Sequence, residues 1–524
     1  MGTKTNAAAA VTVALTATFA TAGSGLAGTD PPTGGQCDET VPGSIINYGL
    51  AGPNAAFDPV ATSGAQVGGT ENAAVWDVLF VYDLETGDVM PHLAESITPN
   101  DDFTVWTLSL REGIAFSDGT PLDAQLVSDN LDRFVVPEGV RNAAAGEVSR
   151  ISDKQVVDEL TLEITLDSPF AQFDSVLADE PGEIVNLNAI GDDVDAFRIQ
   201  PPDEAGLGPY VVGRNVPGEE TVLIARADYW GGPVCIETIR FTWNADAQAT
   251  YDSFRNGELD VALIADPGVV SQAENDGADG VLYPQVFSLI LYFNHRDSFD
   301  TADRRVREAI SLTIDPQIIN DRAYEGQLDA GTMYFGDQSP FWSEDMQELE
   351  LDPERAAELV EEAKADGFDG TITLVSTVDG PGPDTALAVE GLLGSIGITV
   401  EQQPVTRADL ITRLAAGDWD MITTSSFSGA DSGLLALVRY LQSESPSNRM
   451  GYDSDEMDAL LDEALATPYA DLPAVVARIS NQLHDDVALL TYGTADYMLV
   501  TDGVSGIVPS YALVGLFHDA SVDG

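Results

Sequence analysis

Residues 90–122, MPHLAESITPNDDFTVWTLSLREGIAFSDGTPL, combine a strand pattern with a turn sequence at each end. Between residues 103 and 111, polar and apolar side chains alternate, which is typical of a β-strand with one buried face. That face collects the large apolar residues Trp106, Leu108 and Leu110. The flanking segments PNDD (99–102) and SDGTP (117–121) consist of turn-forming residues. The stretch therefore predicts a hairpin in a β-rich subdomain.

The composition places the chain among folded, strongly acidic proteins. It has 524 residues, of which 44% are hydrophobic, and a net charge of −64. This length exceeds that of a usual single domain, and the hydrophobic content can bury a core. Only Lys4, Lys154 and Lys364 are lysines. Because binding to phosphates needs a basic surface, we exclude a general binder of nucleic acids or anionic membranes. We interpret the acidity as a hydrated, self-repelling surface suited to salty water, in preference to recruitment of cations.

The N-terminus resembles an export signal. Lys4 is the only charge before a weakly apolar, small-residue run at 7–22, which ends in an A-x-A-like cleavage site. We predict a signal peptide at 1–22 and a linker at 23–43. The run is too short and too rich in threonine for a membrane span, and no other apolar stretch reaches 18 residues. We therefore expect a soluble exported protein, in the periplasm or at the outer face of the cell membrane.

Further along the chain, strand and helix patterns alternate as in an α/β protein. Strands are predicted at 44–50, 161–166, 221–226, 238–243, 281–294, 371–376, 398–402 and 420–424. Helices are predicted at 72–80, 123–134, 248–256, 303–314, 385–396, 407–416 and 475–483, with two more that begin after the capping residues Asp352 and Ser454. Ligands of open α/β sheets bind at the carboxyl ends of strands. Ser63, Gly64 and Ala65, in the loop after the first strand, are therefore candidate pocket residues, with a plain surface loop as the alternative.

The two cysteines, Cys37 and Cys235, are an even number in a chain with an export signal, which permits a disulfide. Each precedes a predicted strand, at 44–50 and at 237–243. If these strands lie side by side and parallel, both cysteines lie at the same end of the sheet. We predict a Cys37–Cys235 disulfide, and two separate thiols are the alternative.

Three blocks within residues 90–122 carry a family resemblance: LAES (93–96), LREG (110–113) and DGTPL (118–122). In order and spacing they resemble the signature of the family-5 extracellular solute-binding proteins, the oligopeptide, dipeptide and nickel receptors of ABC importers. Similar blocks follow at GLGPY (206–210) and DYWGG (228–232). The resemblance extends from about residue 44 to the end of the chain.

The resemblance implies an α/β, two-lobe, periplasmic-binding-protein type II-like fold with an extra β-rich subdomain in lobe one. Lobe one would span 44–285, with the subdomain at 80–206, and lobe two would span 286–489. Residues 490–524 would return to lobe one. A ligand would bind in the cleft, the lobes would close by hinge motion, and a membrane permease would recognise the closed form.

The resemblance also suggests ligand-binding residues. Tyr292 and Asn294 would lie near the cleft where the chain crosses between lobes, and Tyr492 on the second crossing. In peptide-binding relatives, an aspartate after the strand that here ends at Thr424 pairs with the α-ammonium of the peptide, since a buried charge needs a partner. Here the segment reads SSFSGADSG (425–433), without the tryptophan and proline of the family pattern. Its candidates are Ser425, Ser426, Phe427, Ser428 and Asp431. Either Asp431 takes the anchoring role through a loop shift, or the ligand is not an α-amine peptide.

We expect no enzyme, no cofactor and no directly bound metal. The four histidines, His92, His295, His484 and His518, are scattered without a metal-binding spacing. No G-x-S-x-G motif occurs, and chance pairs of carboxylates are unavoidable in so acidic a chain. Gly206 and Gly208 lack the third glycine of a dinucleotide loop.

We therefore predict a receptor that captures a peptide-like solute for a permease. The alternatives are a non-peptide solute, such as an oligosaccharide or a chelated metal, and an exported hydrolase. Contact with the membrane would run through the permease or through a lipid anchor at Cys37, although Gln36 before it departs from the family lipobox.

Overall fold

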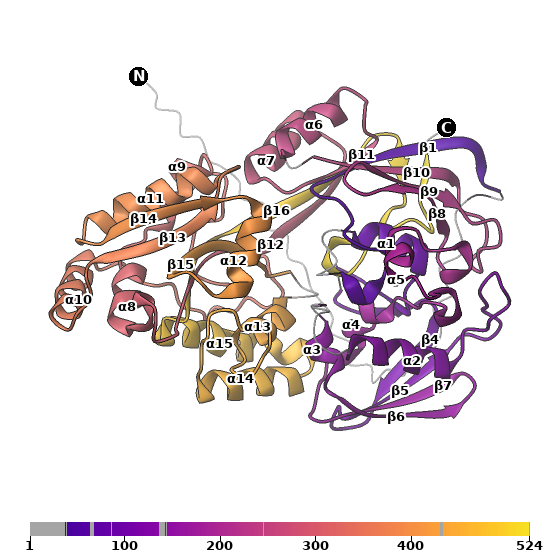
Figure 1. Cartoon of the computed structure of the whole chain (residues 1–524), viewed down its shortest axis with the longest axis horizontal. Coiled ribbons are helices and arrows are strands. Elements are labelled where there is room, and N and C mark those ends of the chain that lie inside the picture. Colours follow the sequence, from indigo (N-terminus) through magenta and orange to yellow (C-terminus); the bar gives the residue numbers. More distant parts are fainter. Residues whose placement is uncertain are drawn as a thin grey trace, which may run out of the picture. The chain divides into compact units, whose positions relative to one another are not determined.

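The computed structural model describes residues 37, 39–62, 68–84, 86–135, 142, 144–244, 246–429 and 433–522 (Figure 1). The predicted signal peptide lies outside these ranges, as do four predicted site residues: Ser63, Gly64, Ala65 and Asp431. The side chain of Phe427 is not described.

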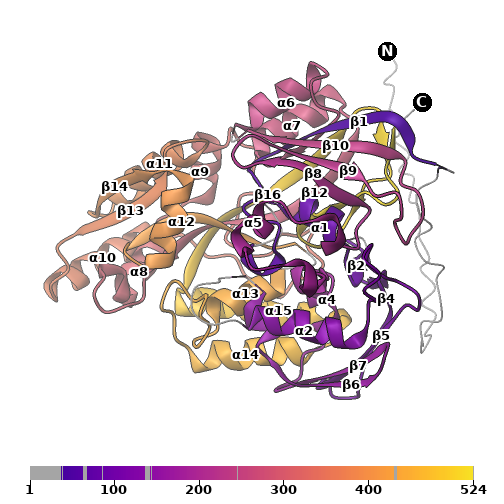
Figure 2. The same ribbon diagram turned by 45° about the vertical axis from the view of Figure 1, so that its right-hand side comes forward.

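A ten-stranded mixed sheet forms the framework, in the order β14-β13-β15-β12-β16-β11-β1-β10-β9-β8. In chain order, its strands are β1 (Val41–Leu50), β8 (Tyr210–Val216), β9 (Glu220–Ala225), β10 (Ile236–Trp243), β11 (Val261–Ile264), β12 (Gly280–Phe293), β13 (Thr371–Thr377), β14 (Thr399–Val405), β15 (Met421–Phe427) and β16 (Leu489–Thr501). The long antiparallel strands β12 and β16 connect its two halves (Figure 2). Their pairing is irregular between Tyr283 and Phe287, where Gln285 has a positive φ of 50°. The predicted α/β class is confirmed, and the predicted strand at 281–294 is β12.

The N-terminal half of the sheet contains the two cysteines. β1 runs parallel to β10, with Val41 opposite Ile236, so the expected parallel arrangement of these strands is confirmed. The structure joins Cys37 and Cys235 in a disulfide at the end of the sheet where both strands begin. The helices of this half are α1 (Gly69–Trp76), α5 (Val194–Ile199), α6 (Ala247–Arg255) and α7 (Pro267–Asp276).

The segment quoted first forms part of a separate four-stranded antiparallel sheet, in the order β4-β5-β7-β6. Its strands are β4 (Ala94–Pro99), β5 (Val105–Leu110), β6 (Ile151–Asp158) and β7 (Thr161–Leu166), and its helices are α2 (Ala124–Phe134), α3 (Ala145–Val148) and α4 (Phe173–Val176). β4 and β5 form the predicted hairpin, and the face of β5 with Trp106, Leu108 and Leu110 is buried. Helix α2 contacts β6 and β7 of this sheet (Figure 1).

The C-terminal half of the large sheet is surrounded by helices. They are α8 (Arg304–Ser311), α9 (Pro316–Ala323), α10 (Pro353–Ala365), α11 (Gly382–Gly394), α12 (Arg407–Ala416), α13 (Gly433–Leu441), α14 (Asp455–Ala466) and α15 (Leu472–Asp486). The predicted caps are confirmed: Asp352 accepts a hydrogen bond from the backbone of Arg355, and Ser454 accepts one from that of Met457. Helices α13, α14 and α15 lie together (Figure 2).

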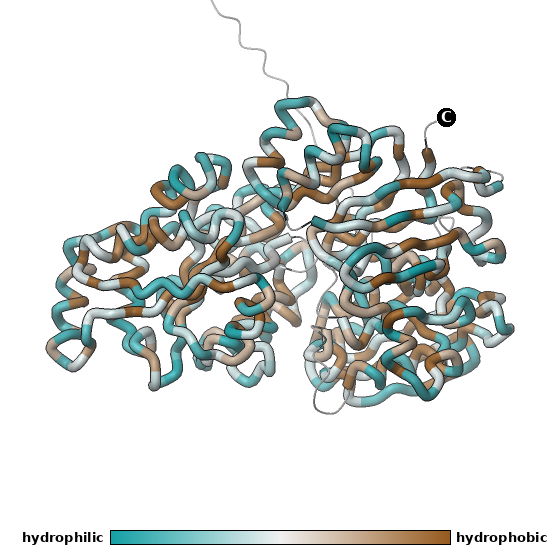
Figure 3. Tube along the Cα trace, turned by 45° about the horizontal axis from the view of Figure 1, so that its top comes forward, coloured by the Kyte–Doolittle hydropathy of each residue, from teal (hydrophilic) through white to brown (hydrophobic). Residues whose placement is uncertain are grey.

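Short strands complete the fold. They are β2 (Phe80–Tyr82) with β3 (Val89–Pro91), β17 (Val504–Ser505) with β20 (Ser521–Val522), and β18 (Val508–Pro509) with β19 (Gly515–Leu516). Hydrophobic and hydrophilic segments are interleaved along the chain (Figure 3). None of the helices among the described residues is both long and apolar enough to span a membrane.

Several predicted boundaries differ from the structure by a few residues, and two of these differences have a clear physical reason. The helix predicted at 72–80 begins at Gly69 and ends at Trp76, because Asp77 has a positive φ of 63° that a helix cannot continue through. The strand predicted at 420–424 continues to Phe427, because β12 pairs with it along that whole length. Helix α13 was not predicted.

Gly206 and Gly208 serve close packing. A Cβ at Gly206 would lie 2.1 Å from the carbonyl oxygen of Val75, and one at Gly208 would lie 2.4 Å from that of Ala74. The Gly208 amide also donates to the Val75 carbonyl at 2.9 Å. These glycines therefore let the chain pass against the end of α1. Close packing explains why glycine stands at both positions, so no bound nucleotide is needed to explain them.

Candidate functional site

Tyr292 and Ser426 lie on the neighbouring strands β12 and β15, where Tyr292 is opposite Ile422 and Ser426 is opposite Ser288. The Ser426 hydroxyl is close enough to Tyr292 to lower the pKa of its phenol. Both are buried, and the hydroxyl of Tyr334 donates to Ser426 Oγ at 2.6 Å. Burial raises the pKa of Tyr292, and the nearby Tyr334 and Tyr440 raise it further. We call Tyr292, Tyr334, Tyr440 and Ser426 the tyrosine cluster. Tyr292, Tyr334 and Ser426 are buried, and Tyr440 is partly exposed.

Two other predicted residues use their polar groups within the fold. The buried Asn294 donates from Nδ2 to the carbonyls of Gly417 and Trp419 at 2.9 and 2.8 Å. Ser428 is also buried, and its Oγ donates to the carbonyl of Gln285 at 2.8 Å. These contacts give both side chains a structural role.

Tyr492 is not near the tyrosine cluster. It packs with Tyr324 in a different hydrophobic cluster from the one that contains Tyr292, and the two hydroxyls lie 3.4 Å apart. The structure thus places Tyr492 in a different hydrophobic cluster from Tyr292.

Strand β15 has an open edge. β12 pairs with it from Met421 to Phe427, whereas β13 pairs with it only at Met421 and Ile422. Residues 423–427 therefore have a strand partner on one side only among the described strands. Ser425, in the middle of this segment, is exposed.

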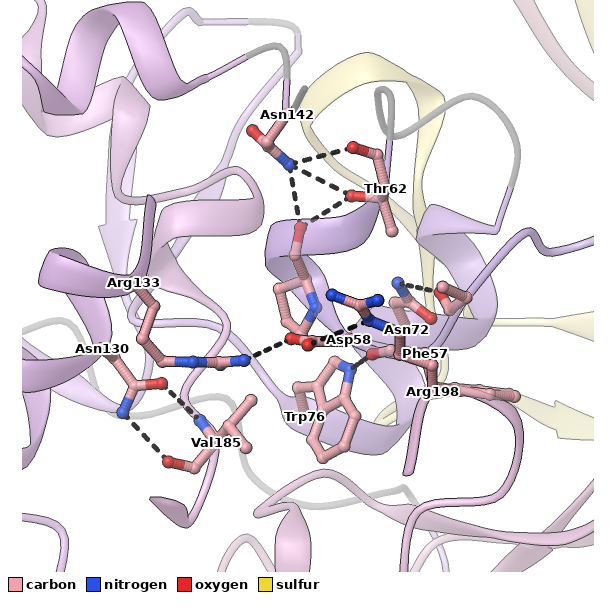
Figure 4. Close-up of polar contacts among 12 residues, drawn as sticks. Phe57, Asp58, Thr62, Asn72, Trp76, Asn130, Arg133, Asn142, Val185 and Arg198 are labelled. Atoms are coloured by element: carbon pink, nitrogen blue, oxygen red, sulfur yellow. Dashed lines mark hydrogen bonds and ion pairs between the residues drawn. The ribbon is translucent and has the colours of Figure 1, made fainter. Parts of the chain in front are cut away.

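The loop after β1 is fixed by a buried carboxylate. Asp58, which is 1% exposed, lies 2.6 Å from Arg133 Nη2 and 3.6 Å from Arg198 Nε (Figure 4). Farther along the loop, the Asn142 amide donates to the carbonyl of Pro59 at 2.8 Å and to Thr62 Oγ1 at 3.2 Å (Figure 4). These contacts hold the loop in place as far as Thr62.

The same loop leads to a set of buried carboxyl groups that we call the acidic cluster, formed by Glu147, Asp179, Glu180 and Glu183. Glu180 accepts hydrogen bonds from Thr62 Oγ1 at 2.6 Å and from Asn142 Nδ2 at 3.1 Å. Burial, together with the charge of Glu180, raises the pKa of both Asp179 and Glu183 well above the usual range.

One cation from helix α13 reaches this cluster. Arg439 Nε lies 2.5 Å from Glu147 Oε1. Burial opposes the charge of Arg439, but Glu147, Tyr511 and Asp179 outweigh it and raise the pKa of the guanidinium. The pair links α13 to the part of the chain that contains the four-stranded sheet. Arg150 and Gln442 form a second link, at 2.8 Å.

A small cavity of about 10 Å³ lies against the acidic cluster. It is lined by Asp179, Glu180 and Glu183 and by Ala73, Val78, Ala178, Ser510, Tyr511, Val514 and Leu516. Its walls thus combine carboxyl groups with apolar side chains.

Sequence reasoning missed the acidic cluster. The segment DEPGE (179–183) resembles any acidic turn in a chain with 87 Asp and Glu residues. The only available signal was Pro181 and Gly182 between the carboxylates, and a turn of that composition is ordinary.

A large mixed sheet joined through two long strands, with helices around it and an added antiparallel subdomain, is the architecture of periplasmic binding proteins of the oligopeptide-binding type. The fold matches a periplasmic binding protein of Helicobacter pylori, associated with an ABC transporter and in complex with the peptide STSA, with a TM-score of 0.79. That match has 19% identity and covers 92% of this chain and 98% of the other.

Residues 88–449 match the model of the bacterial extracellular solute-binding proteins, family 5, and the chain belongs to this family. It is 24% identical over 403 residues to the probable D,D-dipeptide-binding periplasmic protein of Escherichia coli (strain K12), covering 74% of this chain and 75% of the relative. It is 25% identical over 296 residues to the nickel-binding periplasmic protein of the same organism, covering 55% of each chain.

Members of the family are binding proteins of ABC transporters, not enzymes. They bind small peptides or other solutes in the periplasm or outside the cell and work with permease components.

Proposed function

We propose that this protein captures a peptide-like solute in a cleft between two lobes and delivers it to the permease of an ABC importer. Lobe one would comprise residues 44–285 and 490–524, with 80–206 as its subdomain, and lobe two residues 286–489. These boundaries place β12 and β16 at the crossings between lobes, where hinge motion is expected.

The observation that carries the proposal is the open edge of β15. An unpaired strand edge offers backbone N–H and C=O groups, with which an extended peptide forms main-chain hydrogen bonds. Main-chain pairing suits a receptor for peptides of varied sequence, because it does not depend on the side chains of the solute. The tyrosine cluster lies beside this edge through Ser426.

The relatives support the same solute class, since one is named for D,D-dipeptides and a structural neighbour holds the peptide STSA. The nickel-binding relative keeps a chelated metal as the alternative solute.

Titration calorimetry with alanine tetrapeptides, each N-methylated at a single backbone nitrogen, tests the strand pairing. A strand adds through alternate N–H groups. Methylation at alternate nitrogens should therefore weaken binding about tenfold, the equivalent of about 1.4 kcal/mol for a lost hydrogen bond, with little effect at the others. In the Ser425→Ala variant the alternation should persist even where the overall affinity changes, because the pairing runs through the main chain.

An equal loss of affinity on methylation of each backbone nitrogen would contradict strand pairing. Binding of chelated Ni²⁺ or of oligosaccharides, with no binding of any peptide, would contradict the solute class.

A further inference from the structure

Direct contacts join the two proposed lobes outside the two crossings. On lobe one they come from the subdomain, at residues 87, 147–150 and 171–172, and on lobe two from α13 and from residues 465–469. None of these residues belongs to β12 or β16. The proposed lobes therefore meet at a second place, and the contacts there act on how readily the lobes separate.

The first contact runs through the end of helix α14. The Ala171 amide donates to the carbonyl of Leu465 at 2.6 Å, and Gln172 Nε2 donates to the carbonyl of Thr467. Leu465 lies in the last turn of α14, where backbone carbonyls have no partner within the helix. Lobe one thus supplies hydrogen-bond donors to the end of a helix of lobe two.

The second contact is the ion pair between Arg439 and Glu147. The side chain of Arg439 is 14% exposed and that of Glu147 is 3% exposed, and the two are 2.5 Å apart. Removing one partner of such a pair leaves the other charge buried and uncompensated, which is strongly unfavourable. Here that cost arises only while the lobes touch, because separation would expose Glu147 to water.

The third contact is close packing. A Cβ at Gly87 would lie 2.8 Å from Cε1 of Tyr469, so a side chain at this position would have to push the ring aside. The backbone of Gly87 also has a φ of 75°, which favours glycine. The two surfaces thus fit together as closely as parts of one protein interior.

We propose that these contacts form a latch that closes the two lobes before solute binds. We call the contacts of Ala171 and Gln172 with α14, of Glu147 with Arg439 and of Gly87 with Tyr469 the latch. The inference rests on the lobes of the proposed function and adds the part of the molecule that controls their closure.

The latch bears on capture because a solute shifts the balance between open and closed forms only by its preference for one of them. Contacts between protein groups stabilise the closed form equally for every solute. Each solute then has to supply less of the free energy of closure. This arrangement suits a receptor for peptides of varied sequence.

The test measures the distance between two spin labels on the full-length protein without solute, by double electron–electron resonance. The labels are attached at Asp101→Cys in the subdomain and at Glu456→Cys on α14, both exposed positions. The native cysteines are joined in a disulfide, so the introduced thiols are the ones that react. The wild type should show the closed distance as a populated state.

Two variants should shift the molecules towards the open distance. Arg439→Met should lower the ratio of closed to open molecules about tenfold or more, because it leaves Glu147 buried without its partner. Gln172→Met should lower the ratio about threefold, as expected for one hydrogen bond. The milder variant keeps the test decisive if Arg439→Met does not fold.

Arg478→Met is the matched control. It removes an ion pair of similar length, with Arg478 Nη1 at 2.6 Å from Glu463 Oε1, but this pair joins α15 to α14 within lobe two. The ratio of closed to open molecules should not change. The double variant Glu147→Met/Arg439→Met removes both charges and should restore much of the closed form, which a general loss of folding would not do.

Titration calorimetry with an alanine tetrapeptide should show that the affinity falls in the same order as the closed fraction. An equal ratio of closed to open molecules in the wild type, Arg439→Met and Gln172→Met would overturn the latch, as would a wild type that closes only after peptide is added. In either case, peptide binding would leave the proposed function intact. Absence of peptide binding would instead overturn the proposed function, while the label distances still decide on the latch.

Discussion

Asp77 shows how one residue connects the blocks that carry the family resemblance. Its Oδ1 lies 2.5 Å from His92 Nε2, and its Oδ2 accepts hydrogen bonds from the Tyr229 hydroxyl at 3.0 Å and from Trp230 Nε1 at 2.8 Å. His92 belongs to the segment quoted first, and Tyr229 and Trp230 belong to DYWGG. The two segments thus meet at a buried carboxylate, so these residues have a structural role in the fold.

We expect Asp77→Asn to lower the free energy of unfolding by about 3 kcal/mol, because it removes a buried carboxylate that holds three side-chain hydrogen bonds. Burial opposes the charge of Asp77, but the charge and hydrogen bond of His92 outweigh it and lower the pKa of Asp77. The stabilisation of the fold by ionised Asp77 should therefore be present above the pKa of this group in the unfolded chain. It should disappear as the pH falls through the lower pKa of the folded protein. Urea unfolding at several pH values measures it. The exposed Asp101→Asn is the control, and an equal effect of both variants would contradict the prediction.

Glu71 should make the stability depend on pH with the opposite sign to Asp77. Burial raises its pKa from 4.5 to about 7. The folded state therefore binds a proton that the unfolded state releases between these values, and stability falls as the pH rises through that window. Replacing Glu71 with Gln should leave the free energy of unfolding unchanged at pH 4 and raise it by about 3 kcal/mol at pH 8, at about 1.4 kcal/mol per pKa unit. A difference between wild type and variant that did not depend on pH would show that the carboxyl does not titrate there.

At the scale of elements, local signals predicted helices well. Helix α12 has the predicted bounds 407–416, and α10 and α14 begin after the predicted caps. Capping works over three residues and needs no tertiary information. The end of β15 depends on pairing with β12, which lies more than 120 positions away in the sequence. The strand predicted from the local pattern therefore ends three residues too early.

The candidate site was harder to predict for the same reason. Glu147, Asp179, Glu183 and Arg439 come from α3, a short turn and α13, and only the fold brings them together. Asn294 had suggested a ligand contact, but its amide bonds to the carbonyls of Gly417 and Trp419. Polar residue type alone cannot distinguish a group that binds solute from one that satisfies the backbone.

The disulfide joins the beginning of β1 to the segment before β10, across 198 positions of sequence. Replacing Cys37 and Cys235 together with serine should lower the free energy of unfolding by about 2–4 kcal/mol, chiefly because the unfolded chain gains freedom. Thermal unfolding measures the effect. Reduction of the wild type should lower the Tm similarly and should not change the Tm of the variant. A free thiol in the unreduced wild type would contradict the pairing.

For the whole molecule, the net charge of −64 is the dominant electrostatic fact. With 87 acidic and 23 basic residues, most carboxylates have no cationic partner, and their mutual repulsion favours the more expanded unfolded chain. Screening shortens the range of this repulsion from about 30 Å at 0.01 M salt to about 3 Å at 1 M. We therefore expect the Tm to rise by several degrees across that range. Sodium and potassium chloride should act equally at equal ionic strength, because screening does not depend on the identity of the cation, whereas a specific cation site would separate the two salts. A Tm that stayed constant from 0.01 to 1 M would mean that the surface charges are spaced too far apart, or compensated too well, to destabilise the fold.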